Sequence, residues 1–321
     1  MRFALDQLDV LKTMPGKHSE RTEYFLNSSK FLVIHVFLTI VFLFVTMYTD
    51  NAFADQSNHQ SKQDLFRDCE NCPLMKIVPN GEFYMNRPPV WQGRPFGSGP
   101  MRKVLFDKPF AISVYEITIA EWNDCVAKNG CKKEKNSSEK DNQFPVSDVT
   151  WYEATEYISW LSNKTGYKYR LPSEAEWEYS ARSGAGRSRY FGLADAEVCD
   201  YGNVYDITAQ KKLNYEWDPT GCEDAYSRKS PVGSFKPNNF GLFDTIGNVW
   251  EWVEDCKSQG YGTRYMGNRS GPVLRGDCSF RSFRGGSWLS SPPEYIRPED
   301  RFRFAGSSAP DLGFRVVKQN P

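Results

Sequence analysis

The sequence predicts an α+β domain with two main helices, short strands and little other regular secondary structure. Two segments, WYEATEYISWLSNKTG (151–166) and RLPSEAEWEYSARSG (170–184), carry helical periodicity or helix start and stop signals. Short apolar runs between turn-forming residues are typical of short strands. After residue 184 the chain is rich in Gly, Asn, Asp and Trp and shows no helical period. We expect loops there that disulfides, bound ions or buried polar networks hold in place.

Residues 1–54 form an N-terminal leader whose apolar segment, residues 31–48, directs the chain to a membrane. The length of this segment suffices to span a bilayer, which favours a signal anchor. Ala52-Phe53-Ala54 then matches an A-x-A cleavage pattern, which favours a signal peptide. Basic residues precede the segment, so the positive-inside rule places the rest of the chain beyond the membrane in either case. We expect an exported protein, periplasmic in a bacterium, that is soluble after cleavage or anchored by the apolar segment.

Residues 55–68 are polar and predict a flexible linker, and residues 69–321 are expected to form one domain. The chain is 40% apolar and 15% aromatic, which is ample for a packed core. Forty basic residues balance forty acidic ones, so no net field attracts nucleic acid. We expect no nucleic-acid partner, and membrane contact only through the N-terminal segment.

The domain begins with strand signals. Residues 75–85 (MKIVPNGEFYM) hold two apolar runs around Asn80-Gly81, and both of these residues tolerate the positive φ angles of a type I′ hairpin turn. A further strand-like stretch, PFAISVYEIT, starts at Pro109. We therefore expect a hairpin followed by a separate strand.

The first predicted helix begins at Trp151. Its apolar stripe consists of Trp151, Ala154, Ile158 and Leu161. Either Asp148 or Thr150 can cap its start, and Gly166 follows its end.

The second predicted helix is short and sharply bounded. Ser173 and Glu176 have the spacing of a capping box, and Pro172 precedes them. Gly184 is expected to stop the helix after Arg182.

Eight cysteines, an even number, all follow the export segment, which predicts disulfides in an oxidising compartment. Their grouping along the chain suggests the local pairs Cys69–Cys72, Cys125–Cys131, Cys199–Cys222 and Cys256–Cys278. Spacing alone does not choose among the many other pairings. A redox pair or half a zinc site is an alternative for Cys69-x-x-Cys72. No second C-x-x-C and no following histidine supports that alternative.

The histidine count excludes whole classes of enzyme. His18, His35 and His59 all precede the domain. The domain therefore has no imidazole for a Ser-His-Asp triad or for ordinary catalytic zinc.

Several long motifs occur in one fixed order along the chain. They are RLPSEAEWEYSAR (170–182), PVGSFKPNNFGLFDTIGNVWEWVEDC (231–256), FRGGSW (283–288) and LGFRVV (312–317). In these motifs the chain, from about Cys69 to Val317, resembles the formylglycine-generating enzyme family, also called the sulfatase-modifying factor family. The resemblance implies a C-type-lectin-like fold in which calcium organises the loops.

The resemblance also implies two calcium sites. One is formed in the family by an Asn-aliphatic pair and a later Asp-x-aromatic, which match Asn203, Val204, Asp224 and Tyr226. The other uses the turn before the tryptophan motif and matches Asp244, Gly247, Val249 and Glu251. Carboxylate, amide and backbone oxygens are the ligands that calcium prefers. The alternative is that Asp224, Asp244 and Glu251 are solvated loop acids.

The copper chemistry of the family does not carry over. Members that oxidise a sulfatase cysteine bind copper(I) through two cysteines just after the GGS-aromatic motif, and those positions here are Ser290 and Tyr295. Copper(I) requires soft thiolate ligands, so copper is not expected. Glu294 in the same loop is a candidate acid–base residue, although a lone glutamate is usually solvated surface.

Three functional hypotheses follow from the sequence. The chain is a copper-independent oxidase or other modifying enzyme, a non-catalytic ligand-binding or protein-binding module, or a formylglycine-generating oxidase with different chemistry. The substitutions at Ser290 and Tyr295 argue against the last. The partner in the first two hypotheses is an unidentified small molecule or protein.

Overall fold

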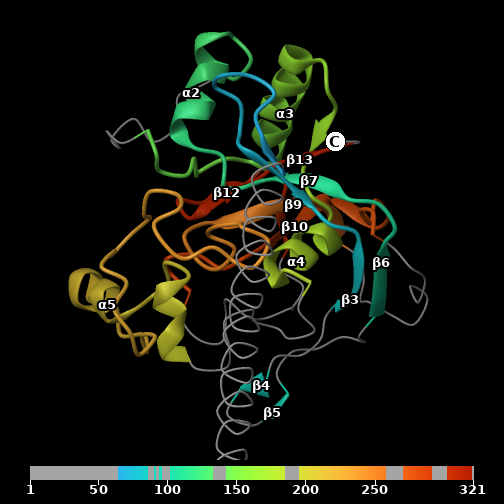
Figure 1. Ribbon diagram of the computed structural model, residues 1–321. Coiled ribbons are helices and arrows are strands. Elements are labelled where there is room, and N and C mark those ends of the chain that lie inside the picture. The colour runs from blue at the N-terminus through green and yellow to red at the C-terminus, as the bar shows by residue number, and fades with distance from the viewer. Residues whose placement is uncertain are drawn as a thin grey trace, which may run out of the picture. The chain divides into compact units, whose positions relative to one another are not determined.

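The computed structural model describes residues 64–85, 90–91, 94–95, 102–132, 142–184, 195–257, 270–290 and 302–319, all within the unit Gln63–Pro321 (Figure 1). The predicted leader and its apolar segment lie outside these residues. Within the described ranges, no helix is both long and apolar enough to cross a bilayer. The mixture of helices and separate sheets confirms the predicted α+β class.

Four α-helices and one 3-10 helix occur in the described part of the chain. They are α2 (Ile119–Ala127), α3 (Trp151–Thr165), α4 (Glu174–Arg182), η1 (Asp195–Asp200) and α5 (Ile207–Leu213). The predicted helices are α3 and α4. Thr150 caps α3 and Gly166 ends it at φ 76°, while Ser173 and Glu176 form the predicted capping box of α4.

Helices α2 and α5 were not predicted. Thr118 and Asp206 cap them, yet α2 has 9 residues and α5 has 7. Such short helices carry too few apolar positions for a clear period, so the cap is the main local signal.

The strands form two larger sheets and two small ribbons. They are β1 (Leu65–Phe66), β2 (Met75–Val78), β3 (Gly81–Met85), β4 (Val90–Trp91), β5 (Arg94–Pro95), β6 (Arg102–Phe106), β7 (Phe110–Ser113), β8 (Tyr169–Arg170), β9 (Trp250–Lys257), β10 (Asp277–Arg284), β11 (Phe302–Phe304), β12 (Leu312–Phe314) and β13 (Val317–Lys318). The larger sheets have the orders β1-β2-β7-β13-β8 and β11-β10-β9-β12, and the ribbons are β3-β6 and β4-β5. The last strands, β12 and β13, enter different sheets and so join both to the C-terminal segment.

The predicted hairpin at residues 75–85 is wrong in its pairing. Both apolar runs form strands, but β2 pairs with β7 and β3 pairs with β6. Neither Asn80 nor Gly81 has a positive φ. Val78 and Phe83 are instead buried in one apolar cluster with residues distant in sequence. Burial against these partners outweighs the local preference for a turn.

The predicted linker ends earlier than the sequence suggested. Strand β1 pairs with β2, and Phe66 packs against the main apolar cluster. Asp68 accepts hydrogen bonds from the Tyr169 hydroxyl and, at 2.7 Å, from Lys318 Nζ. Both partners lie far along the chain, so the composition of this polar segment does not reveal them.

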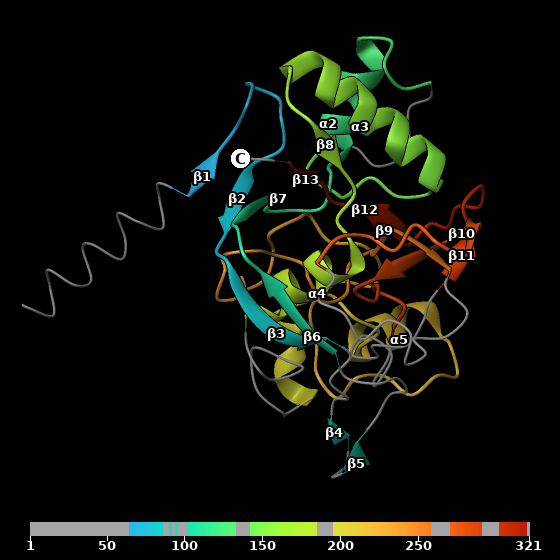
Figure 2. The ribbon, with the colours of Figure 1, turned by 90° about the vertical axis from the view of Figure 1, so that its right-hand side faces the viewer.

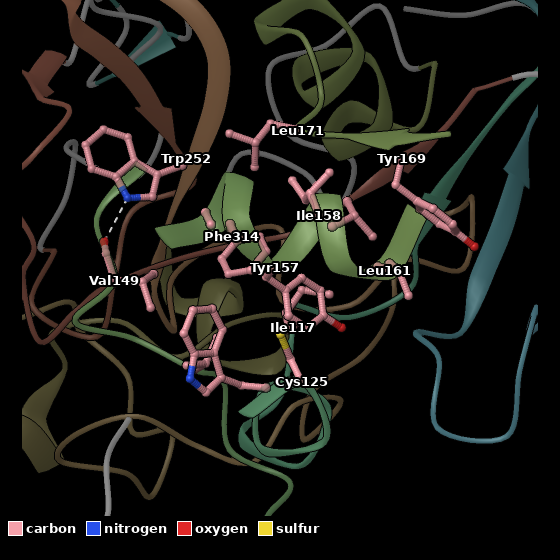
Figure 3. Packing of buried hydrophobic residues seen from close by; sticks show 14 of the residues in the cluster. Ile117, Cys125, Val149, Tyr157, Ile158, Leu161, Tyr169, Leu171, Trp252 and Phe314 are labelled. Atoms are coloured by element: carbon pink, nitrogen blue, oxygen red, sulfur yellow. Dashed lines mark hydrogen bonds between the residues drawn. The ribbon is translucent and has the colours of Figure 1, made fainter. Parts of the chain in front are cut away.

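The main core lies between α3, α2 and the sheets. Figure 3 shows Tyr157, Leu161 and Phe314 packed together and Trp252 pointing at Val149. The Trp252 indole Nε1 donates to the Val149 carbonyl at 3.0 Å, which satisfies the polar atom of a fully buried ring.

Helix α4 is polar but almost entirely buried. Its three glutamates are all in ion pairs. Glu174 pairs with Arg284, and Glu178 pairs with Arg182 at 2.6 Å. Glu176 accepts a bidentate pair of hydrogen bonds from Arg170. A buried charge is tolerated only when it is paired and hydrogen-bonded. The pair with Arg284 connects α4 to β10, and the pair with Arg170 connects it to β8.

All four suggested disulfides are confirmed. The bonds are Cys69–Cys72, Cys125–Cys131, Cys199–Cys222 and Cys256–Cys278, and no cysteine is free. Each one closes a local loop of a chain with little regular structure. Cys69 and Cys72 thus form a bonded pair rather than a pair of thiolates.

Candidate functional site

A tight turn follows β10, just before the loop in which the sequence resemblance predicts the positions of the two copper cysteines. Gly285 and Gly286 have φ angles of 105° and 81°. The Ser287 backbone N–H donates to Ser290 Oγ at 3.0 Å, and the Ser290 N–H donates to the Ser287 carbonyl at 2.9 Å. Ser287 Oγ donates to Asp311 at 2.7 Å. Ser290 is 2% exposed, so its hydroxyl serves the turn and is not open to a ligand.

Aromatic and basic side chains surround this turn. The Arg228 guanidinium lies 5.5 Å from the centre of the buried Trp288 ring. The backbone N–H of buried Tyr205 donates to the Ser290 carbonyl at 3.0 Å. The Tyr205 ring contacts Tyr215 and Trp217, which are 40% and 50% exposed. The other predicted residues of this loop, Glu294 and Tyr295, lie outside the described residues.

The first predicted calcium set comes together in space. Asp224 accepts hydrogen bonds from the backbone N–H groups of Val204 at 3.0 Å and Tyr226 at 2.8 Å. The Asn203 amide nitrogen donates to the Arg228 carbonyl at 2.8 Å, whereas its oxygen is buried without a partner. An unsatisfied amide oxygen is costly to bury, which makes it a natural ligand atom.

Asp206 is a member of this cluster that sequence reasoning missed. It caps α5 and also accepts from the Asp224 backbone N–H at 2.5 Å. Oxygen atoms of Asp206 and Asp224 lie within 4.8 Å of each other and of Cys199 Sγ. That sulfur is bonded to Cys222 and is no thiolate. Burial, and then the Asp206 carboxylate, raise the pKa of Asp224 to about 7. The only local signal for Asp206 was its suitability as a helix cap.

The second predicted set is also assembled, beside the first. Gly247 bridges to Asn203, and a Cβ on Gly247 would lie 1.9 Å from the Asn203 carbonyl oxygen. Asp244 is 1% exposed; one carboxylate oxygen accepts from the Gly233 N–H at 2.7 Å and the other is buried without a partner. Glu251 is fully buried and accepts from Trp177 Nε1 at 2.7 Å. The alternative that these acids are solvated is therefore wrong.

Arg315 and Glu116 complete the buried charge around the second set. Arg315 binds Glu251 through Nε at 2.6 Å and through a terminal nitrogen at 2.7 Å. Glu116 accepts from the Asn248 side chain at 2.7 Å and from a backbone N–H at 3.1 Å. Burial raises the pKa of Glu116 well above its usual range, and the Asp244 and Glu251 charges add to this. Three buried acids thus face one arginine, so they cannot all ionise unless a further positive charge is present.

These residues fit a hard cation and do not fit copper. Each set contains one buried oxygen atom without a partner, on Asn203 and on Asp244, and each contains a carboxylate. Calcium binds such oxygens, and its charge offsets the excess of acids. At the copper position, by contrast, Ser290 offers a hydroxyl that is already used, where copper(I) needs thiolates.

A separate cavity of about 650 Å³ lies beside α2. Its lining includes Arg67, Tyr115, Glu121 and Asn142 and none of the predicted site residues. It therefore does not belong to the loop after Trp288.

The comparisons with known sequences agree with these observations. The sequence model of the sulfatase-modifying factor enzyme 1-like domain matches residues 61–320. The formylglycine-generating enzyme of Mus musculus is 34% identical over 179 residues, which are 55% of this chain and 44% of that enzyme. The inactive C-alpha-formylglycine-generating enzyme 2 of Bos taurus is 26% identical over 297 residues, which are 76% of this chain and 87% of that protein. The chain spans about half the length of the formylglycine-generating enzymes it matches.

The fold is also similar to a solved structure. That of PvdO from Pseudomonas aeruginosa superposes with a TM-score of 0.67 and 30% identity, covering 79% of this chain and 97% of PvdO. The likeness confirms the predicted α+β fold of the formylglycine-generating-enzyme type, although the described residues contain four α-helices where the sequence predicted two.

Proposed function

Because the chain belongs to the sulfatase-modifying factor enzyme 1-like family, we propose that it is an exported, oxidase-type modifying enzyme that works without copper. The observation that carries this proposal is Ser290. The turn of the family is present, but a buried hydroxyl that accepts the Ser287 N–H stands at a copper-thiolate position. The four disulfides support export to an oxidising compartment.

The residue inventory restricts the oxidation chemistry. All cysteines are bonded and all histidines precede the domain, so neither a thiolate nor an imidazole serves as redox ligand. In an oxidation that uses neither ligand, the substrate passes two electrons and two protons directly to dioxygen, which becomes hydrogen peroxide. Exposed Tyr215 and Trp217 near Ser290 offer ring faces for an electron-rich planar substrate. Glu294 remains the predicted acid–base residue.

The second candidate function is a non-catalytic binding module. The match over 87% of a relative named inactive favours it, as does the lack of thiolate and imidazole ligands. In this case the same aromatic surface binds a small molecule or protein without changing it.

Two measurements, copper(I) binding and conversion of a sulfatase-motif peptide, test the claim that the chain does not use copper. Purified chain is titrated with copper(I) against a chelating dye, and a sulfatase-motif peptide is followed by mass spectrometry, with an active formylglycine-generating enzyme as control. We expect no stoichiometric thiolate-type copper binding and no converted cysteine. Conversion of the peptide would overturn the proposal.

Oxygen uptake separates the two candidate functions. Dioxygen consumption and peroxide release are measured with a panel of substituted phenols and catechols, comparing the natural chain with Trp217→Ala and with Tyr84→Ala as a control at an equally exposed aromatic residue on β3. Uptake that Trp217→Ala reduces and Tyr84→Ala does not supports the oxidase. Binding of these compounds without any uptake supports the module.

Calcium at the two predicted sets is part of the proposal. Asn203, Val204, Asp224 and Tyr226 would hold one ion, and Asp244, Gly247, Val249 and Glu251 the other. When bound, the ions supply charge compensation and fix the loops. The unpartnered oxygens of Asn203 and Asp244 support this assignment.

Chelation followed by thermal melting tests the calcium sites. We expect EDTA to lower the melting temperature and added calcium to restore it, because calcium binds the folded state alone. Asp244→Asn should reduce the difference in melting temperature between calcium and EDTA. Asp200→Asn, which breaks an exposed ion pair with Lys236, should leave this difference unchanged. An EDTA effect of zero in the natural chain would refute both sites.

A further inference from the structure

Two arginines face each other on neighbouring strands, one before and one after the loop that carries Ser290, Glu294 and Tyr295 in the sequence. Arg281 of β10 and Arg303 of β11 are directly opposite in the antiparallel register. Side chains opposite each other on one face of a sheet lie close together, and like charges there destabilise the pair. β11 is the edge strand of its sheet, and Figure 2 shows β10 and β11 beside one end of α3. Such an arrangement calls for a compensating group.

Aromatic rings hold both guanidinium groups in place. The Arg281 guanidinium lies 3.9 Å from the centre of the Trp151 ring, and the Arg303 guanidinium lies 5.9 Å from that of Phe283. The Trp151 ring is itself fixed, because its Nε1 donates to the Val253 carbonyl at 3.0 Å. Stacked arginines keep their charge and present their donors in a fixed plane, so little order is lost on binding an anion.

Arg281 has one terminal nitrogen left for a ligand. Its other terminal nitrogen donates to the Glu254 carbonyl at 2.6 Å, and its Nε is buried without a partner, out of reach of an incoming anion. Arg303 is half-buried. Within the described ranges, no carboxylate lies at ion-pair distance from either guanidinium. Two adjacent positive charges with free donors are a binding site for an anion.

Two carboxylates act on Arg281 without contacting its guanidinium. The charges of Glu254 and Asp255 both favour the charged form of Arg281, while Glu254 lies 3.8 Å from Arg170 and keeps one carboxylate oxygen without a hydrogen-bond partner. Glu153 accepts the Thr150 N–H in the cap of α3, and Asp148 accepts from Ser308.

We propose that Arg281 and Arg303 bind a sulfate or phosphate group carried by a ligand of this protein. Two guanidinium groups side by side match an oxyanion with three or more oxygens and up to two negative charges. A single carboxylate would satisfy only one fork. The site is independent of the proposed oxidation chemistry, since it shares no residue with the turn after Trp288.

Anion titration of the calcium-saturated full chain tests the site. Sodium sulfate, methyl sulfate, methyl phosphate and acetate are added at matched ionic strength against sodium chloride, and binding is followed by calorimetry and thermal shift. We expect sulfate or phosphate to bind and chloride to have no comparable effect. The tighter of methyl sulfate and methyl phosphate identifies the group. Acetate binding as tightly as sulfate would overturn the assigned class.

Arg303→Gln is the decisive variant. It should weaken sulfate binding about tenfold or more, because one charged fork is lost. Without anion it should melt at the same or a higher temperature, because it removes the like-charge pair. Arg303→Lys keeps the charge but not the fork and should bind at intermediate strength. Arg275→Gln removes one positive charge at an exposed arginine shortly before β10 and should bind sulfate as tightly as the natural chain does. Equal sulfate affinity of Arg303→Gln and the natural chain would refute the site.

Discussion

Replacing Arg315 by methionine should unfold this domain at a much lower temperature. Arg315 is 1% exposed and holds three separate segments together. It binds the Glu251 carboxylate with two nitrogens, at 2.6 and 2.7 Å, and donates to the carbonyls of Ser113 at 3.1 Å and Phe243 at 3.0 Å. Methionine has similar length but offers no donor and no charge.

The magnitude follows from what the substitution leaves behind. Removing one partner of a buried ion pair costs about 3–5 kcal/mol, because the other charge stays buried alone. The orphaned carbonyls of Ser113 and Phe243 add about 1 kcal/mol or more each, less whatever water restores. We therefore expect a loss of about 5 kcal/mol in the free energy of unfolding. For a domain of this size that corresponds to a melting temperature lower by about 10–20 °C.

The assay is urea and thermal unfolding with calcium present, compared with Arg275→Met as the exposed control. Arg315→Lys should lose about half as much, since it keeps the charge without the fork. The difference in melting temperature between calcium and EDTA should also grow in Arg315→Met, because three acids then face no arginine. A loss below about 1 kcal/mol, or a smaller calcium effect, would refute this account of the buried charge.

Three further predictions concern the backbone, a disulfide and pH. Gly247→Ala should lower the free energy of unfolding, measured with urea, by about 3 kcal/mol or more. The φ angle of Gly247 is 76°, and a Cβ there would lie 1.9 Å from the Asn203 carbonyl oxygen. Gly271→Ala, with open space around it, is the control. The double change Cys256→Ser and Cys278→Ser opens a loop of sequence separation 22 and should cost about 3 kcal/mol; an unchanged unfolding midpoint would contradict this. Burial, followed by the charge of Glu174, raises the pKa of Asp255 to about 7. This pKa is above the value in the unfolded chain, so the folded state favours the protonated carboxyl. The stabilisation that results is complete below about pH 4 and is lost as the pH rises through 7. Asp255→Asn removes one hydrogen-bond acceptor and should therefore lower the free energy of unfolding at low pH. The decrease in the free energy of unfolding between pH 4 and 7.5 should be smaller in this variant by about 2–4 kcal/mol. A pH profile identical to that of the natural chain would show that Asp255 is not the titrating group.

The elements that sequence predicted best are those with local signals. The capping box of Ser173 and Glu176 and the left-handed Gly166 concern residues a few positions apart, and both occur as expected. The four disulfides are also local and follow the grouping of the cysteines. The predicted hairpin at Asn80-Gly81 is wrong because β2 and β3 find better partners elsewhere in the chain.

The candidate site divides in the same way. Its ligand positions, such as Asp224 and Asp244, were predicted from motif order. Asp206 was missed because its contact with Asp224 is made across a loop, and Glu116 was missed because it meets Asn248 more than a hundred residues away. The residues that carry the oxygen atoms can be read from the sequence, whereas the distances between these atoms depend on the fold.

The sequence by itself determined the family, the number of cysteines available for disulfides and the two best-capped helices, and it placed Ser290 and Tyr295 where the family resemblance predicts the copper cysteines. These features depend on residue identity and on short separations along the chain. The tertiary structure alone decided that the acids of the predicted sites are buried, that Arg315 faces two of them together with Glu116, and that Arg281 lies opposite Arg303. Burial and electrostatic coupling depend on distances between residues remote in sequence, and these distances are fixed only when the loops close around the core.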